Sequence, residues 1–455
     1  MDSGYERVCK VIQFVIFVGF ALVGSSFNPG GKEHNNTNFR ILCIMLFISR
    51  LLLGIQYSVA LFFIRRKVRG LAWPLGLTIA CFILCGGAFY SMVPAFSETS
   101  GNGLGIYYVW YIIIAIEVAV VVGTACVWRR LSFKKTHLME RMGLLTLIIV
   151  GEGAIGVTKT VAKLMSKSGL TFEGCFLVVC IVLILTFLFL LYFDPAPTHH
   201  IGSIRQLAWA ALHFPLHLSL IGIVEGSQQI ALARYVFAAL HRFQHAASSA
   251  CLTQHLSGAS LAAALAAAVA PFKLDEKLES RDQVPVIMAG IAAAGNATGV
   301  CSAENVAAGG GGMPDVLRAV TTDVLGGLFE SIGVTPPKGV GAYESARSAY
   351  FTLYVYYWAS LLIAMLCLGA ILWVVATSAA SASKGKGRMD VFEKLALGSR
   401  AVVVVVAAGL GAGAANRLFI YNFLGSLAVL PVVAGLLGAV VLIDRLGRWL
   451  VLRKS

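Results

Sequence analysis

The chain consists largely of long apolar runs, and short segments between them hold most of its charged residues. A helix needs about 20 apolar residues to cross a hydrocarbon core, and about ten runs reach that length. Strands of a membrane barrel would instead show alternation over roughly ten residues, so the runs predict helices. We therefore predict an all-α, polytopic integral membrane protein with about ten transmembrane helices. The runs occupy residues 8–27, 41–64, 72–93, 105–127, 142–162, 174–193, 206–232, 347–377, 397–415 and 423–443.

The composition excludes an ordinary soluble protein. Hydrophobic residues make up 58% of the chain and charged residues 13%, whereas about a quarter of the residues in soluble domains are charged. The net charge of +14 would suggest nucleic acid in a soluble protein. Here the basic residues flank the apolar runs, which is the pattern that membrane topology produces. We therefore expect the lipid bilayer as the partner and no nucleic acid.

The distribution of basic residues predicts the orientation of the chain. If every run crosses the membrane once, four basic clusters fall on one side, which predicts that both termini are cytoplasmic. The sequence leaves open whether the membrane is the plasma membrane or an endomembrane, and Lys159, Lys163 and Lys167 weaken the pattern. The four clusters lie at residues 65–69, 129–135, 384–388 and 445–454.

Two further features agree with this orientation. The two N-x-[ST] sequons, beginning at Asn35 and Asn296, both fall in segments predicted to be outside, so the protein is a candidate glycoprotein. Cys251 and Cys301 share the second of these segments and could pair in an oxidising compartment.

Composition divides the chain into three parts. Residues 1–234 hold seven runs joined by short connections and are predicted to form one membrane unit. Residues 235–345 are rich in Ala, Gly and Ser, which predicts a long external loop, largely disordered, with one Ala-rich helix or a re-entrant helix near 257–270. Residues 346–455 hold three Ala-, Val- and Gly-rich runs, typical of closely packed helices, and a short basic cytoplasmic tail.

The stretch IVGEGAIG, residues 149–156, has the G-x-G-x-x-G spacing of a dinucleotide-binding turn. It lies midway along a membrane-length run, where binding a diphosphate would carry a large desolvation cost. We therefore interpret the glycines as positions that let a neighbouring helix approach, and we expect no cofactor. Glu152 is then the informative residue of this stretch.

Ionisable residues lie within four of the runs, away from their ends. Each costs about 2.5–3.5 kcal/mol at a helix centre, so we expect them to face one another or a wet cavity. Helical periodicity places His213, His217 and Glu225 within one broad face of their run. The candidates for an ion or proton site are Arg50, Glu117, Glu152, His213, His217 and Glu225.

Two hypotheses account for these residues. In the first, the protein is a transporter or channel for protons, cations or a small solute. One arginine faces at least two midplane carboxylates, so one carboxylate lacks a fixed partner, which suits ion binding. The histidines would pass protons. In the second, Arg50 pairs with Glu117 or Glu152, and the pair only fixes helix packing in a structural or regulatory membrane protein.

A third hypothesis is a histidine-metal membrane enzyme. His213 and His217 have the i, i+4 spacing that places two imidazoles on one helix face, and Asp194, His199 and His200 follow the preceding run. Such enzymes need more ligand clusters than this sequence offers, so these histidines are weak metal candidates. The question of enzyme activity stays open.

Three stretches carry a resemblance to a known family. The segment from Glu140 to Glu152 resembles the E-R-x-G-L-x-T…L-G-E helix of the bacterial low temperature requirement A family and its fungal relatives. ISRLLLGIQYSVALFFI around Arg50 and Gln56 is similar to that family's R-L-x-L-x-[IL]-Q-Y span, and HFPLHLSLIGIVEGSQQ is similar to the fungal branch. The resemblance covers roughly residues 1–235 and implies a multi-pass membrane protein whose biochemical activity is not well defined.

The chain departs from the family's pattern at one place. Members usually begin with a span that carries an E-L-F-[FY]-D-L type motif, and no such segment occurs in this sequence. We therefore expect a fungal-type member without the family's N-terminal span.

Overall fold

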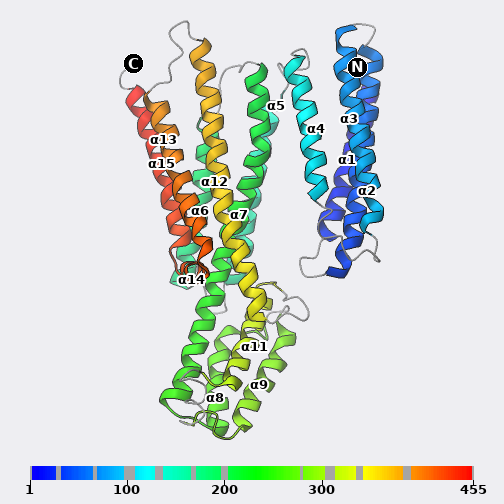
Figure 1. Ribbon diagram of the computed structural model, residues 1–455. Helices are drawn as coiled ribbons and strands as arrows, with labels where there is room; N and C mark the ends of the chain where they lie inside the picture. The colour runs from blue at the N-terminus through cyan, green and yellow to red at the C-terminus, as the bar shows by residue number, and fades with distance from the viewer. Residues whose placement is uncertain are drawn as a thin grey trace. The chain divides into compact units, whose positions relative to one another are not determined.

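The computed structural model shows helices as the regular elements throughout the residues that it describes (Figure 1). Nine helices among these residues are long and apolar enough to cross a membrane. This confirms the predicted all-α polytopic membrane protein. The described residues are 3–26, 32–64, 69–96, 108–128, 137–164, 171–195, 203–276, 280–302, 313–334, 342–382 and 391–452.

The first of two compact units comprises residues 1–135 and 202–207. Helix α2 packs along α3 because Gly86 has no side chain; a Cβ there would lie 3.2 Å from the Cβ of Arg50. Residues 8–26 of the predicted run 8–27 lie in α1, which packs on α2 but is not one of the nine membrane-length helices. The elements are α1 (Ser3–Ser26), α2 (Lys32–Ile64), η1 (Arg69–Leu71), α3 (Ala72–Ser91), η2 (Val93–Phe96) and α4 (Tyr108–Val127).

The second unit comprises residues 136–201 and 208–455. One continuous apolar core joins its helices, with α6 packed along both α5 and α15. The predicted single unit over residues 1–234 therefore differs from the structure, because α5, α6 and most of α7 pack with the C-terminal helices. The membrane-length helices are α5 (Leu138–Leu164), α6 (Phe172–Phe193), α7 (Ser203–Ser248), α12 (Ala342–Ala382), α13 (Val391–Ala412) and α15 (Val429–Leu452), with η7 (Gly413–Ala415) and α14 (Arg417–Leu424) before α15.

Two of the three glycines of IVGEGAIG are contact positions. A Cβ at Gly153 would lie 2.7 Å from a methyl group of Val224 on α7 and 2.8 Å from one of Leu185 on α6. Gly156 lies against the Gln228 side chain of α7. Gly151 has open space around it, so the predicted packing role is confirmed for two positions and wrong for Gly151.

Residues 235–345 fold differently from the prediction. In place of a largely disordered loop, the described parts form a helical subdomain, which comprises residues 235–334, beyond one end of the bundle of the second unit (Figure 1). The Ala-rich helix expected here is α8. The Gly309–Gly312 run lies outside the described residues. The elements after α7 are the π-helical turn η4 (Ser249–Thr253), α8 (Gly258–Val269), η5 (Ala270–Phe272), η6 (Arg281–Gln283), α9 (Val284–Asn296) and α11 (Asp315–Ser331).

Small residues explain why this Ala- and Gly-rich segment folds. A Cβ at Gly295 would lie 2.8 Å from the Cβ of Ala262, so α9 approaches α8 closely. A Cβ at Gly327 would lie 2.9 Å from Ile287, so α11 approaches α9 in the same way. The Leu, Ile and Val side chains that occur at intervals in this segment are then buried between the helices. They form a packed core that the Ala- and Gly-rich composition did not indicate.

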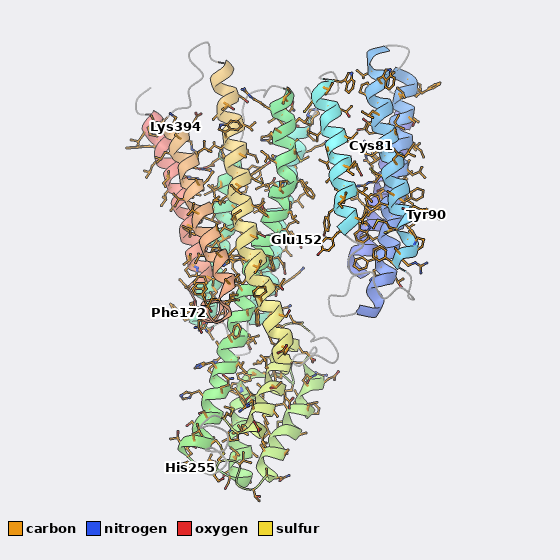
Figure 2. All side chains as sticks on the ribbon, in the orientation of Figure 1. Cys81, Tyr90, Glu152, Phe172, His255 and Lys394 are labelled. Carbon is orange, nitrogen blue, oxygen red and sulfur yellow. A yellow bond between two sulfur atoms is a disulfide. The ribbon has the colours of Figure 1, made fainter. Side chains whose placement is uncertain are left out.

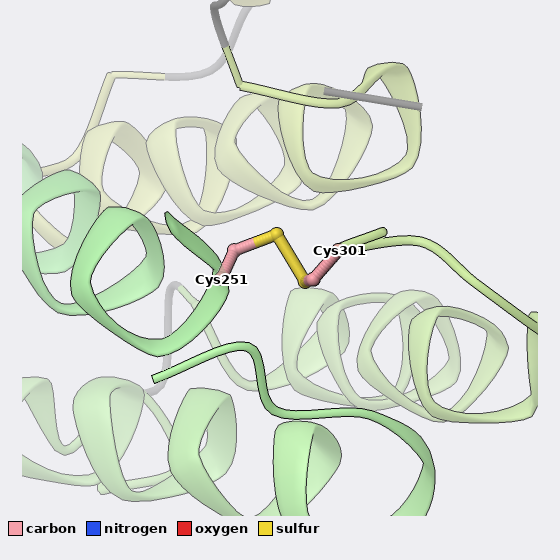
Figure 3. The surroundings of a disulfide bond; sticks show 2 residues. All are labelled: Cys251 and Cys301. Atoms are coloured by element: carbon pink, nitrogen blue, oxygen red, sulfur yellow. A yellow bond between two sulfur atoms is a disulfide. The ribbon is translucent and has the colours of Figure 1, made fainter. Parts of the chain in front are cut away.

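A disulfide joins Cys251 in η4 to Cys301 in the turn after α9 (Figure 3). It closes a loop with a sequence separation of 50 residues. The other eight cysteines are free. The disulfide that the sequence allowed is therefore present. It joins the turn that follows α7 to the turn that follows α9.

We predict that Cys251→Ser lowers the free energy of unfolding of the subdomain by about 2–4 kcal/mol, because the cross-link no longer restricts the unfolded chain. Hydrogen exchange of the α8 and α9 amides in the purified protein measures this loss. The double variant with Cys301→Ser should lose about the same amount, since one bond is removed in both cases. Cys175→Ser, at an exposed free thiol, is the control; equal protection in all variants would contradict the prediction.

Candidate functional site

Arg50 and Glu117 form an ion pair within the first unit. The Arg50 Nε lies 3.0 Å from the Glu117 Oε2, and their side chains are 16% and 13% exposed. Arg50 also donates from Nη1 to the Ser49 hydroxyl at 3.0 Å, and its guanidinium lies 5.5 Å from the centre of the Phe89 ring. Of the two partners that the sequence left open for Arg50, its described ion pair is with Glu117.

His213 is buried in the second unit, on α7, with both ring nitrogens engaged. Its Nδ1 lies 2.7 Å from the Trp209 carbonyl oxygen, so Nδ1 carries the proton and donates it. Its Nε2 lies 2.8 Å from the Tyr192 hydroxyl of α6, which then acts as the donor. The tautomer follows from these partners.

His217 lies one turn further along α7 and contacts α5. Its Nε2 is 2.8 Å from the Thr146 hydroxyl oxygen, and that hydroxyl lies 3.0 Å from the Met142 carbonyl. When the hydroxyl donates to the carbonyl, the Nε2–H of His217 donates to the hydroxyl. The rings of the two histidines have centres 5.5 Å apart. Tyr192, His213, His217 and Thr146 together are the histidine network, which joins α5, α6 and α7.

The hydrogen bonds of the network oppose a metal site at the two histidines. His213 has no lone pair left for a metal once Tyr192 donates to its Nε2. Among the described residues, no group of three or more His, Cys, Asp or Glu side chains is placed to hold a metal ion. Asp194 accepts instead from Arg448 of α15 at 2.7 Å. His199 and His200 lie outside the described residues.

Glu152 is exposed, unlike the buried histidines, and it is not part of a described ion pair, unlike Arg50 and Glu117. It lies midway along α5, on an exposed part of the second unit (Figure 2). No other described residue forms a hydrogen bond or ion pair with its carboxylate. Glu225 is also exposed, on α7, and accepts a hydrogen bond from Gln229 at 2.9 Å.

Within the second unit, the predicted residues do not form one cluster. Arg50 and Glu117 are paired in the first unit, the two histidines are buried in the second, and Glu152 and Glu225 lie on exposed faces. The broad face predicted for this part of α7 is not one buried face, because His213 and Glu225 lie at its two edges and point in different directions. Gln228 of α7 is also buried, and its Oε1 lies 3.4 Å from the Thr160 hydroxyl of α5.

Sequence reasoning missed a second buried ion pair. Arg400 of α13 is 2% exposed, and its Nη1 and Nη2 donate to the two carboxylate oxygens of Asp444 on α15, at 3.0 and 2.6 Å. Nη1 also donates to the Ala396 carbonyl at 2.8 Å. The sequence did contain a signal for this pair. Arg400 lies near the start of the predicted run 397–415, and Asp444 follows directly after the predicted run 423–443.

The family model of the bacterial low temperature requirement A protein (LtrA) matches residues 2–313. The chain belongs to this family. Comparison with curated proteins and with solved structures gave no match. The LtrA match contains the Arg50–Glu117 pair, the histidine network and Glu152. It extends past residue 235, where the recognisable motifs end, and includes α8 and α9 of the subdomain.

We predict that either Arg50→Met or Glu117→Gln alone lowers stability by about 3–5 kcal/mol, because the remaining polar group loses its partner among apolar helices. The double variant should lose clearly less than the sum of the two single losses. Thermal unfolding of the purified protein in detergent checks this. Arg318→Gln, at an exposed position of α11, is the control; additive single losses would contradict the prediction.

Proposed function

We propose that this LtrA family protein moves protons or cations across the membrane, with Glu152 as the ion-binding group. The observation that carries the proposal is the carboxylate midway along α5 for which the described residues provide no partner. A charged carboxylate is unfavourable at that depth. Binding a proton or a cation removes the charge, so a free carboxylate there is suited to exchange ions with a pathway.

The charge count supports Glu152 over the other predicted candidates. Arg50 neutralises Glu117, and Arg400 neutralises Asp444. Glu225 has a hydrogen-bond donor in Gln229 on its own helix. We therefore assign Arg50, Glu117 and Glu225 no ion-binding role, and Glu152 remains as the exchangeable group.

The histidine network is the second part of the proposal. His213 is neutral in the hydrogen-bonding arrangement described, because its Nδ1 donates and its Nε2 accepts, and imidazoles can pass protons by changing tautomer. Thr146 anchors the network to α5 six residues before Glu152, which corresponds to about 9 Å of helix rise. We propose that the network relays protons along the second unit toward the level of Glu152.

The alternative function is a structural or regulatory membrane protein whose buried charges only fix helix packing. The bidentate Arg400–Asp444 pair and the Arg50–Glu117 pair favour it, because each joins a cation and a carboxylate of different helices. Buried pairs of this kind can specify packing without further activity. The two functions differ in what they require of Glu152.

We also propose an orientation in which the helical subdomain faces an oxidising compartment and the termini are cytoplasmic. The Cys251–Cys301 disulfide favours such a compartment for the subdomain. Arg445 and Arg448 lie near the end of α15, at the opposite end of the second unit (Figure 1). The predicted clusters at 129–135 and 384–388 lie outside the described residues.

We predict that Glu152→Gln lowers proton flux at least about tenfold, because the amide cannot bind a proton at neutral pH. The measurement is pH-gradient-driven flux into liposomes that contain equal amounts of purified protein. Glu225→Gln makes the same chemical change on another exposed carboxylate and should leave flux unchanged. Wild-type flux that persists in Glu152→Gln would refute the assignment. Absence of flux in all three proteins would favour the structural function.

We predict that Asn296 carries an N-linked glycan when the chain passes through a eukaryotic secretory pathway, because Asn296 and Thr298 are both exposed at the end of α9. An endoglycosidase-sensitive mobility shift on a gel measures this. The part of the shift due to Asn296 should disappear in Asn296→Gln and in Thr298→Ala, and remain in Thr298→Ser, which keeps the sequon. A shift that is the same in all variants would contradict the proposed orientation.

A further inference from the structure

A cavity of about 630 Å³ lies in the second unit, where α5, α6 and α7 meet the helical subdomain. Its volume is within the usual range for sites that bind small molecules. The end of α5, the first turns of α6, the second half of α7 and η5 all contribute to its wall. Part of the wall is apolar and buried, formed by Leu164, Leu177, Ala231 and Phe272.

Two of the charges in the wall neutralise each other. The Arg234 Nε lies 2.6 Å from the Glu173 Oε1, and the Arg234 Nη1 donates to the Gly425 carbonyl at 2.6 Å. Arg234 is thereby held in place and contributes little net charge. Glu173, the acidic residue of the cavity wall, is already paired with Arg234, which disfavours a cationic ligand.

Arg242 supplies the surplus positive charge of the cavity. It lies two turns after Arg234 on the same helix, and its described hydrogen bond is from Nε to the Ala238 carbonyl of its own helix, at 3.3 Å. Its two terminal nitrogens have no hydrogen-bond partner among the described residues. A guanidinium in this state is suited to a planar or tetrahedral oxyanion. His241, which is exposed beside it, adds a further donor.

The cavity lies at the level where the apolar helices end. The membrane-length run of α6 begins at Phe172, whose ring is 91% exposed (Figure 2). The apolar run of α7 ends at residue 232, two residues before Arg234. Aromatic residues and arginines are typical of the boundary between hydrocarbon and headgroups. Phospholipid headgroups present their phosphate groups at this level of a bilayer.

We propose that this cavity binds the phosphate of an anionic phospholipid headgroup. Arg242 contacts the phosphate, and the apolar wall accommodates the glycerol and the first carbons of the acyl chains. The site is separate from Glu152 and from the histidine network, so the proposal does not depend on ion transport.

Lipid-dependent stabilisation of the full-length protein in neutral detergent tests the proposal. The thermal unfolding midpoint is titrated with phosphatidylglycerol and with phosphatidylcholine of the same acyl chains, and with inorganic phosphate. Ligand that binds the folded state raises the midpoint in a saturable way. We expect phosphatidylglycerol to stabilise the wild type more strongly than the other two probes.

The variants locate the binding to the cavity. Arg242→Gln should raise the half-saturating concentration of phosphatidylglycerol at least about tenfold, because charge-assisted hydrogen bonds to the phosphate are lost. Ala238→Trp, which fills the cavity without changing its charge, should have a similar effect. Arg318→Gln removes the same charge on α11 outside the cavity and should bind like the wild type.

Three results would overturn the proposal. An equal half-saturating concentration of phosphatidylglycerol in Arg242→Gln and in the wild type would show that Arg242 does not contribute to lipid binding. Equal stabilisation by phosphatidylcholine would show that the anionic headgroup is not recognised. Stabilisation by inorganic phosphate at the same concentration would assign the cavity to a soluble phosphate ligand and exclude the lipid.

Discussion

A hydrocarbon surrounding offers no water to a charged side chain, so each ionisable group among these helices needs a partner from another helix or from a bound ion. The Arg50–Glu117 pair meets this requirement between α2 and α4, and the Arg400–Asp444 pair meets it between α13 and α15. Because each pair joins two helices, the charges also select which helices pack together. The pairing of these charges thus has the same cause as the apolar composition of the helices, namely the absence of water around them.

The close approach of the helices depends on small residues as much as on charge. Gly153 and Gly156 bring α5 against α6 and α7, and this approach places Thr146 of α5 within reach of His217. The histidine network is therefore a consequence of backbone proximity that glycine permits. The G-x-G-x-x-G spacing has no nucleotide chemistry here, since two of its glycines serve a packing role and Glu152 between them is exposed.

Membership of the LtrA family identifies a multi-pass membrane protein, and the proposed ion exchange rests on the position of Glu152. The paired charges have a sufficient structural explanation, whereas a carboxylate without a described partner at membrane depth does not. The helical subdomain adds a second chemistry at the other end of α7, where Arg242 and an apolar wall lie at the headgroup level. Ion exchange and lipid recognition would then occur at separate places on one helical unit.

The sequence by itself determined the class of the protein, the family and the nine membrane-length helices found among the described residues, because long apolar runs are local properties of the chain. Only the tertiary structure decided that Arg50 pairs with Glu117, that Glu225 lies apart from the histidines, and that the Ala-rich segment folds around a disulfide. These features depend on which helices pack against each other. Helical periodicity predicts which residues share one face of a helix, but it does not identify the helix that packs on that face. The Arg400–Asp444 pair escaped prediction for the same reason, since two residues near the ends of separate runs become one interaction only when α13 and α15 pack side by side.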